Sequence, residues 1–381
     1  MKYQKISIIG DGLSGLVMAA SLADLNLNID IYYQNSKSNY KKDKRVTAIS
    51  ESNYKFLKTK IKMKYQNLFW ECDKINLFYE NDEKYLNFLN FKEKNKNLMY
   101  IFENSKIKNF LKKTLKKNKK IRFFKKKINK INLSSNCIQI NNDMKFYDCI
   151  LLCTGRNSEL HNNIMEGRSI SKNYNETAIT TNINHKFEIS NPSQYFLKEG
   201  PFAILPIKKN CFSLVWTVKK DFYNNNLKNF REIINKKLQK IFKIKRKLSI
   251  NQINSFPVFL NLEKKYFKFN TLVFGEGIHS VHPLAGQGFN LVLRDIKKLS
   301  ELIERHIKLG LNIKDSNILG DFYNQREPEN TLFGLGIHFT NAFFKRYDMV
   351  EPFKLSILKN INYFKKVKDL SMRISDKGFL P

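Results

Sequence analysis

The chain has 381 residues, a formal net charge of +34 and a pI near 9.8. This length supports one large or two medium domains and excludes a small scaffold that depends on disulfides. A surplus of positive charge normally suggests nucleic acid or an acidic membrane as a partner. Here the basic residues are mostly Lys and are spread along the whole chain, so we favour compositional drift and expect no nucleic-acid site.

Cysteine usage and hydropathy point to a reducing, aqueous environment. The five cysteines, an odd number, form no C-x-x-C pair, which argues against a disulfide framework. The first residues run straight into a strand and a glycine turn, so no secretory signal is expected. No stretch approaches 18 uninterrupted apolar residues, as a membrane-spanning helix would need. We therefore expect a cytoplasmic protein.

The N-terminus carries a glycine fingerprint between two expected strands. A strand over residues 5–9 is followed by Gly10, Gly12 and Gly15 in G-x-G-x-x-G spacing, by a helix, and by a second strand over 29–33. The first glycine makes the turn, the second lets a pyrophosphate approach the backbone, and the third lets the helix pack on the strand. Together with the amides of Leu13 and Ser14, this pattern predicts dinucleotide binding.

One part of the fingerprint is missing at the end of the second strand. The acidic residue that normally binds an adenosine ribose should fall near position 33, where the chain has Tyr33 followed by Gln34. Asp30 lies an odd number of residues earlier, so it faces the other side of the strand. Gln34 offers a neutral hydrogen bond instead, and we expect a weaker or reshaped adenosine site.

A second glycine-rich segment, GEGIHSVHPLAGQGFNLVLRD, covers residues 275–295. Gly286 and Gly288 remove side chains where backbone must come close to a ligand, and Pro283 stiffens the approach. The helix that follows directs free amides and partial positive charge back toward the loop. The segment is suited to a flat, electron-rich ligand.

Several motifs occur in an order that resembles a known family, and the likeness extends over essentially the whole chain. Besides the two glycine segments they are KDKRVTAIS, MYIFEN, LLCTGRNS, GPFAILPI and YNQRE, at residues 42–50, 99–104, 151–158, 200–207 and 323–327. The sequence resembles the FAD-dependent aromatic-ring monooxygenases, and most of all the ubiquinone-biosynthesis hydroxylases.

The resemblance implies an α/β (α+β) fold with a Rossmann-like FAD-binding domain, an inserted antiparallel-sheet substrate domain and C-terminal helices. The corresponding segments are 1–62, 98–170 and 265–320 for FAD, 63–97 and 171–264 for substrate, and 321–381 for the helices. Apolar runs at 121–128, 137–140 and 147–153 would complete the FAD-binding sheet.

The family chemistry needs little acid–base machinery from the protein. FAD reduced by NADPH or NADH reacts with dioxygen, and the resulting flavin hydroperoxide delivers one oxygen to a polyprenylated phenol. The resemblance therefore implies no catalytic side chain, and it places Pro283 beside the flavin, Glu276 at the ribityl chain and the amides of 286–290 at the ring. The implied cofactor-binding residues are Gly10, Gly12, Leu13, Ser14, Gly15, Gln34, Arg45, Asn104, Gly155, Glu276, Pro283, Gly286, Gln287, Gly288, Phe289 and Asn290.

Some of these assignments have alternatives. Arg45 either lies near the flavin or pairs with Asp43 on the surface. Asn104, together with Glu103, is expected mainly to cap a helix that begins near residue 105. Phe202, Leu205, Pro206 and Trp216 are expected in the substrate pocket. For Phe202 and Trp216 the alternative is the core, and the sequence does not separate the two.

Departures from the family pattern bear on turnover. Glu276 stands where the family has Asp or Asn, which is tolerable because it still accepts a hydroxyl bond. Thr154 replaces an Asp and His161 replaces an Arg in a region that the family uses to hold FAD and the nicotinamide cofactor. The alternative function is therefore a catalytically weakened member of a ubiquinone-biosynthesis complex, which would have other proteins of that pathway as partners.

Three further patterns have simpler interpretations. His279 and His282 have metal-ligand spacing, but no third ligand motif accompanies them, so we expect no metal. The basic run over 106–130 has apolar residues at helical spacing and predicts a packed amphipathic helix. The C-terminal 60 residues mix aromatic side chains with Lys and Arg. They either hold the protein peripherally on the inner, anionic face of a membrane or only pack on the FAD domain.

Overall fold

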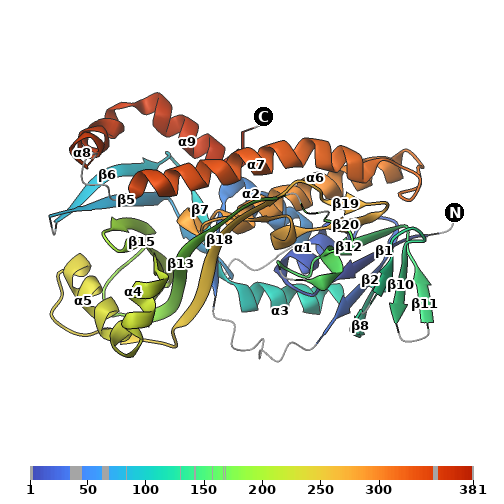
Figure 1. Cartoon of the computed structure of the whole chain (residues 1–381), viewed down its shortest axis with the longest axis horizontal. Coiled ribbons are helices and arrows are strands. Elements are labelled where there is room, and N and C mark those ends of the chain that lie inside the picture. Colours follow the sequence, from blue (N-terminus) through green and yellow to red (C-terminus); the bar gives the residue numbers. More distant parts are fainter. Residues whose placement is uncertain are drawn as a thin grey trace.

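The computed structural model describes residues 3–34, 45–61, 68–82, 84–128, 130–140, 143–156, 158–165, 167, 169–345 and 351–379. Two large sheets lie side by side and a long helix, α7, extends along both of them (Figure 1). The strands β1, β2 and β12 belong to one sheet, and β13, β15 and β18 belong to the other.

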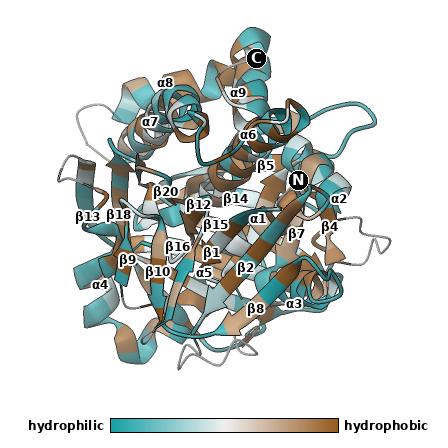
Figure 2. Ribbon diagram, turned by 90° about the vertical axis from the view of Figure 1, so that its right-hand side faces the viewer, coloured by the Kyte–Doolittle hydropathy of each residue, from teal (hydrophilic) through white to brown (hydrophobic). Residues whose placement is uncertain are grey.

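The first sheet has the strand order β19-β20-β12-β1-β2-β8. Its pairs are parallel, apart from the antiparallel edge pair β19–β20. The central strands are apolar on both faces, as parallel strands covered on both sides require (Figure 2). Its strands are β1 (Gln4–Ile9), β2 (Leu27–Tyr33), β8 (Ile121–Lys125), β12 (Cys149–Leu152), β19 (Phe267–Lys268) and β20 (Thr271–Val273).

Four helices pack around the first sheet, with α1 in contact with the other three. They are α1 (Leu13–Leu22), α2 (Glu51–Ile61), α3 (Asn104–Leu115) and α6 (Gly288–Lys308). In α3 the apolar residues Ile107, Leu111 and Leu115 are buried in the main core. This confirms the packed amphipathic helix expected within the basic run.

One strand expected in this sheet lies elsewhere. Cys137–Ile140 is β10, the middle strand of a separate antiparallel sheet with β9 (Lys130–Asn132) and β11 (Asp143–Phe146). Its apolar residues are buried while Gln139 is exposed. That alternation is typical of a half-covered antiparallel strand, so the assignment to the FAD-binding sheet was wrong.

Asp30 has a structural role within β2. Its carboxylate accepts bonds from Arg122 Nε at 2.9 Å and from the Tyr147 hydroxyl at 2.7 Å. The residue is buried on the face of the sheet that its position in the strand predicts. These bonds connect β2 to β8 and to the chain before β12, which leaves Asp30 unavailable as a ribose ligand.

The second sheet is mostly antiparallel, with the order β21-β18-β13-β16-β15-β14-β5-β6, and β17 pairs with β13. The long β13 carries a bulge between Asn173 and Glu176. The strands are β5 (Lys74–Asn81), β6 (Lys84–Lys92), β13 (Ser169–Asn184), β14 (Ser193–Leu197), β15 (Gly200–Lys208), β16 (Cys211–Lys219), β17 (Ser249–Ile250), β18 (Asn254–Glu263) and β21 (His279–Ser280). A small sheet between the two large ones contains β3 (Val46–Ser50), β4 (Trp70–Cys72) and β7 (Met99–Glu103).

The remaining helices flank the second sheet and the C-terminal side. Phe230, Ile234 and Leu238 of α5 are buried in the core that the second sheet forms. The helices are α4 (Lys220–Asn225), α5 (Phe230–Phe242), α7 (Ile318–Phe344), α8 (Glu351–Asn360) and α9 (Lys365–Lys377). Within the described residues, none of these helices has an apolar stretch long enough to cross a bilayer.

Candidate functional site

Two cavities adjoin where the sheets meet. One, of about 940 Å³, surrounds the turn between β1 and α1, and we call it the glycine-turn cavity. The other, of about 680 Å³, lies against the second sheet, and we call it the sheet cavity. Arg45, Thr47, Asn104, Glu276 and Phe289 line both cavities, so the two form one elongated site.

The three glycines of the fingerprint have different surroundings. A Cβ on Gly10 would lie 2.2 Å from the Cys153 carbonyl oxygen, and one on Gly15 would lie 2.2 Å from the Gly10 carbonyl oxygen. A Cβ on Gly12 would meet nothing within 4 Å, because Gly12 faces the cavity. Gly10 and Gly15 therefore allow close packing, and Gly12 leaves room for a ligand at the start of α1, where Leu13 and Ser14 also line the cavity.

The far end of the glycine-turn cavity is basic. Tyr33 and Gln34 line it together with Lys126, Lys127 and Lys130. Asp11, in the glycine turn, is bound by Lys112 Nζ at 2.5 Å. This lining suits a pyrophosphate and offers a ribose the neutral amide of Gln34.

The second glycine segment forms the wall shared with the sheet cavity. Pro283, Gly286, Gln287, Gly288 and Phe289 line the sheet cavity, and Gly286 has a φ of +65°. Gln287 is the N-cap of α6, but its side chain makes no capping bond, so the first amides of α6 are free of a side-chain cap. The Gln287 Oε1 atom is buried without a hydrogen-bond partner among the described residues. An open helix start and an unsatisfied amide fit the polar edge of a flavin.

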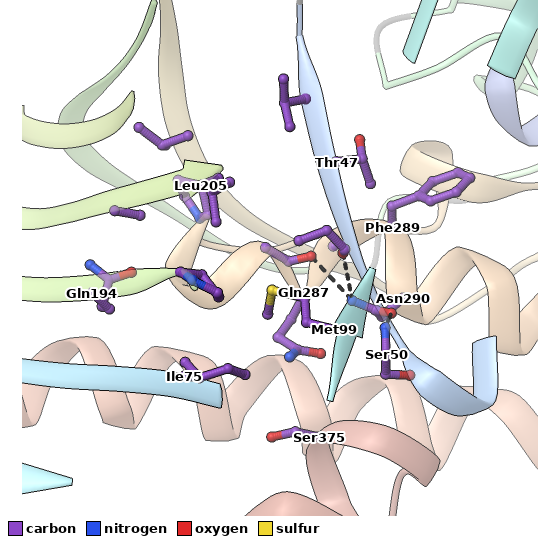
Figure 3. A pocket seen from close by; sticks show the side chains of 18 of the residues that line it. Thr47, Ser50, Ile75, Met99, Gln194, Leu205, Gln287, Phe289, Asn290 and Ser375 are labelled. Atoms are coloured by element: carbon purple, nitrogen blue, oxygen red, sulfur yellow. Dashed lines mark hydrogen bonds between the residues drawn. The ribbon is translucent and has the colours of Figure 1, made fainter. Parts of the chain in front are cut away.

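Asn290 fixes this loop to the neighbouring strand β3 (Figure 3). Its Oδ1 accepts from the Ser50 amide at 2.9 Å and from Asn53 Nδ2 at 2.8 Å. Its Nδ2 donates to the carbonyl oxygens of Ala48 at 3.1 Å and Gly286 at 3.3 Å. From the sequence we expected only the backbone amide of Asn290 to contribute to the site. The role of its side chain depends on contacts with residues 48–53, which are distant in the sequence and leave no local pattern.

Arg45 and Asn104 both reach the site. Arg45 is exposed and lines both cavities, while its alternative partner Asp43 lies outside the described residues. Asn104 Oδ1 accepts a bond from Thr47 Oγ1 at 2.6 Å. Neither Glu103 nor Asn104 caps α3 as expected, because α3 begins at Asn104 and its N-cap, Glu103, makes no capping bond.

Only one of the four residues considered for the substrate pocket lines the sheet cavity. Leu205 does so together with Ala203, since alternate residues of β15 face the cavity. Phe202 and Trp216 are fully buried in the core on the other face of the sheet, and Pro206 shares the face of Phe202. The pocket assignment of Phe202, Pro206 and Trp216 was wrong, because it ignored this alternation.

Trp216 is therefore expected to govern stability. Its ring packs against Phe202 and Phe230, with centroid distances of 5.4 Å to each. Trp216→Ala should lower the free energy of unfolding by about 3–5 kcal/mol through lost burial and a residual cavity. Urea denaturation measures this, with the half-exposed Trp70→Ala as the control. An unchanged midpoint for Trp216→Ala would contradict the core assignment.

The two histidines of the loop bind carboxylates. His279 Nε2 lies 2.6 Å from Asp295 Oδ2, and His282 Nε2 lies 3.0 Å from Glu176 Oε2. No group of three or more metal-ligating side chains with suitable geometry occurs in the described part of the chain. Both histidines are buried, so these bonds satisfy polar groups in the interior.

Asp295 is the centre of a buried polar network that joins α6 to α7. Besides His279, its carboxylate binds Arg326 Nε at 2.6 Å and Asn330 Nδ2 at 3.1 Å. Arg326 also binds Glu329. Burial alone would raise the pKa of Asp295, but the charge of Arg326 and the His279 contact lower it.

Thr154 and His161, the two departures near β12, contact each other. Thr154 Oγ1 lies 2.8 Å from His161 Nε2. Thr154 and Gly155 both line the glycine-turn cavity, and Gly155 has a φ of +77°. Burial lowers the pKa of His161 to about 4. At neutral pH this neutral pair occupies the place where the family resemblance implies charged groups.

The pKa of His161 predicts a pH dependence. An unfolded His titrates near 6.5, so between about pH 6.5 and 4 the unfolded chain binds a proton that the folded protein does not. The free energy of unfolding therefore decreases as the pH is lowered through this window. His161→Gln should make the free energy of unfolding less dependent on pH in this window, by an amount on the order of 2 kcal/mol. Urea denaturation at several pH values tests this, with the partly buried His306→Gln as the control. Identical profiles for wild type and His161→Gln would contradict it.

The C-terminal helix α9 supplies a wall of the sheet cavity that sequence reasoning missed. Asp369, Met372, Arg373 and Asp376 of α9 line it. Asp376 Oδ1 accepts a bond from the Ser52 amide at 2.8 Å, and Arg294 NH2 donates to the Ser375 carbonyl oxygen at 2.8 Å. The sequence of α9 shows apolar residues at every third or fourth position, which predicts an amphipathic helix. It does not show which part of the chain this helix packs against.

Comparison with known proteins agrees with this site. The FAD binding domain family matches residues 153–309. The chain is 31% identical over 162 residues to ubiquinone hydroxylase UbiL of Rhodospirillum rubrum, covering 42% of this chain and 38% of that protein. It is 24% identical over 284 residues to the mitochondrial ubiquinone biosynthesis monooxygenase COQ6 of Dictyostelium discoideum, covering 60% and 57%. The chain therefore spans 38% and 57% of the lengths of these two relatives, less than two thirds of each.

A solved structure shares the overall fold. The p-nitrophenol 4-monooxygenase PnpA of Pseudomonas putida DLL-E4 superposes with a TM-score of 0.79 at 13% identity and covers 99% of both chains. The domain match identifies an FAD binding domain over residues 153–309, and the likeness to PnpA shows that the two chains share a fold. Among curated proteins, the relatives named above are a ubiquinone hydroxylase and a ubiquinone biosynthesis monooxygenase.

Proposed function

We propose that this protein is an FAD-dependent monooxygenase that hydroxylates the aromatic ring of a polyprenylated phenol in ubiquinone biosynthesis. NADPH or NADH would act as reductant, and dioxygen would supply the oxygen atom. The carrying observation is the elongated site, in which a basic cavity at the glycine turn continues into a largely apolar cavity against the second sheet.

The chain's residues have distinct roles in this proposal. Gly12 and the start of α1 would hold the pyrophosphate, Gln34 the ribose, and Glu276 the ribityl chain. Pro283, Gln287 and the free amides at the start of α6 would hold the flavin ring, with Asn290 positioning the loop. FAD supplies the redox chemistry with dioxygen. The apolar wall of the sheet cavity would place the phenol ring and keep water away from the reacting atoms.

The test is to purify the protein, record its visible spectrum and add NADPH or NADH without oxygen. Flavin bands that bleach, followed by a hydroxylated product when oxygen and a prenylated phenol are supplied, support the proposal. A protein that retains no FAD after reconstitution would contradict it.

The neutral Thr154–His161 pair favours a second candidate, a catalytically weakened member of a ubiquinone-biosynthesis complex. Because this pair carries no charge at neutral pH, it offers a nicotinamide cofactor less electrostatic attraction than an Arg would. Bound flavin that neither NADPH nor NADH reduces, although dithionite does, would support this candidate. Co-purification with other ubiquinone-biosynthesis proteins would be expected as well.

We also propose peripheral attachment to the inner, anionic face of a membrane through α8 and α9. Phe353, Tyr363 and Phe364 are 72%, 84% and 59% exposed, and Lys365, Lys366 and Lys368 lie next to them. Lysines near an anionic surface contribute about 1 kcal/mol each. Lys365→Glu/Lys366→Glu should therefore weaken binding to phosphatidylglycerol vesicles more than 10-fold in flotation assays. Lys116→Glu/Lys117→Glu, at the end of α3, is the control. A wild-type protein that does not bind these vesicles would contradict the proposal.

A further inference from the structure

The floor of the sheet cavity is an apolar sheet surface with two buried polar side chains. Gln194 of β14 and Ser213 of β16 line the cavity and are only 6% and 2% exposed. Their sequence neighbours Tyr195, Phe212 and Leu214 face the core on the opposite side. Figure 3 shows Gln194 and Leu205 on the sheet side of the cavity, across from Phe289 and Asn290.

Both polar groups keep unused hydrogen-bonding capacity. Gln194 Nε2 donates to the Tyr195 carbonyl oxygen at a long 3.4 Å. The Ser213 hydroxyl has no hydrogen bond to a described residue. A buried polar group without a partner is costly, so such groups are retained where a ligand completes their bonds.

Small and apolar residues lie between Gln194 and Ser213 on the surface of the sheet. Gln194 is opposite Ala203, which is opposite Val215, and Ser213 is opposite Leu205. Two strands apart corresponds to roughly 10 Å between their backbones. Gln194 and Ser213 can therefore each hydrogen-bond to a different substituent of one ring. The small side chain of Ala203, between them, leaves room for the ring itself.

The charges around the cavity do not follow the charge of the whole protein. Although the chain carries +34, the described lining of the sheet cavity has five acidic and four basic residues. These are Glu51, Glu93, Glu276, Asp369 and Asp376, and Arg45, Lys96, Arg373 and Lys377. All four basic side chains are exposed, and one of them, Arg45, lies where the two cavities join. No buried cation lines the described floor to pair with a carboxylate on a bound ring.

We propose that Gln194 and Ser213 are the residues that orient the substrate ring, and that they select a neutral phenol over its carboxylated counterpart. This inference rests on the proposed function of the same cavity. A phenolic hydroxyl can donate to Gln194 Oε1 or accept from the Ser213 hydroxyl. A ring carboxylate would be desolvated against the floor without a cation, which is unfavourable.

Isothermal titration calorimetry with two probes tests the proposal. The probes are 2-heptylphenol and 3-heptyl-4-hydroxybenzoate, which differ only in the carboxylate. Wild-type holoprotein should bind the phenol at least about 10-fold more tightly. Gln194→Leu and Ser213→Ala should each weaken phenol binding about 3- to 10-fold. Gln194→Arg should shift the preference toward the carboxylate.

The matched control is Gln239→Leu, because Gln239 lies on α5 outside the cavity and bonds the Lys245 carbonyl oxygen. It should leave both affinities unchanged. Equal binding of the two probes by wild type, or unchanged phenol binding in both Gln194→Leu and Ser213→Ala, would overturn the inference. Circular dichroism and FAD content identify a variant that fails to fold. Probe discrimination without flavin reduction or hydroxylation would contradict the proposed function and leave this inference standing.

Discussion

Replacing Gly12 with valine is expected to abolish FAD retention while the fold survives. A Cβ at Gly12 meets no protein atom within 4 Å, and its backbone is extended, with φ −64° and ψ 174°, which any residue adopts. The valine side chain would therefore occupy the space at the start of α1 that a pyrophosphate needs. We expect FAD affinity to fall at least ~100-fold, equivalent to about 2.7 kcal/mol.

Flavin absorbance after desalting, combined with thermal unfolding of the apoprotein, checks this result. Gly336→Val is the matched control, since Gly336 lies in α7 and also has open space around its Cβ position. Gly10→Val should instead unfold the protein, because its Cβ would collide with the Cys153 carbonyl oxygen. A Gly12→Val protein that retains a full complement of FAD would show that the pyrophosphate does not lie at this turn.

Replacing Asp295 with alanine is expected to destabilise the protein by about 3–5 kcal/mol, because it leaves buried Arg326 with one carboxylate partner in place of two. The same change removes the carboxylate partner of His279 and one of the hydrogen-bond partners of Asn330. Because α6 begins in the second glycine-rich segment, which we propose holds the flavin ring, we expect FAD retention to decline together with stability. Urea denaturation measures the effect, with exposed Asp315→Ala as the control.

The lowered pKa of Asp295 gives this prediction a pH signature. A carboxyl whose pKa is depressed by folding stabilises the protein above its unfolded value of about 3.9, and this contribution disappears as the pH falls through the folded value. The stability difference between wild type and Asp295→Ala should therefore shrink below about pH 4. A difference that stays constant down to acid unfolding would mean that the ionised carboxylate contributes little.

The local sequence pattern was sufficient to predict those parts of the candidate site that consist of backbone. The glycine spacing predicted both the β1–α1 turn and the loop before α6, because a turn or a close approach restricts which residues can occupy those positions. The family resemblance supplied the identity of the ligand. It also implied the class of fold, which the likeness to PnpA supports.

Side-chain partners across long sequence separations were not predictable. Asn290 contacts Ser50 across 240 residues, and Asp376 contacts Ser52 across 324. For Phe202 and Trp216, the pattern identified buried strands but not which face would be covered by helix α5 and which by the cavity. Cys137–Ile140 was misplaced for a similar reason, since a short apolar run does not specify the sheet that it joins.

The contact between Asp376 and Ser52 has a practical consequence. The Ser52 amide, at the start of α2, is held by a carboxylate from α9, the helix that walls the sheet cavity. Hydrogen exchange at this single amide therefore reports whether the wall is docked. Following it by NMR on isotopically enriched protein while a ligand is added would report the opening and closing of the cavity, without a reporter group attached to any side chain.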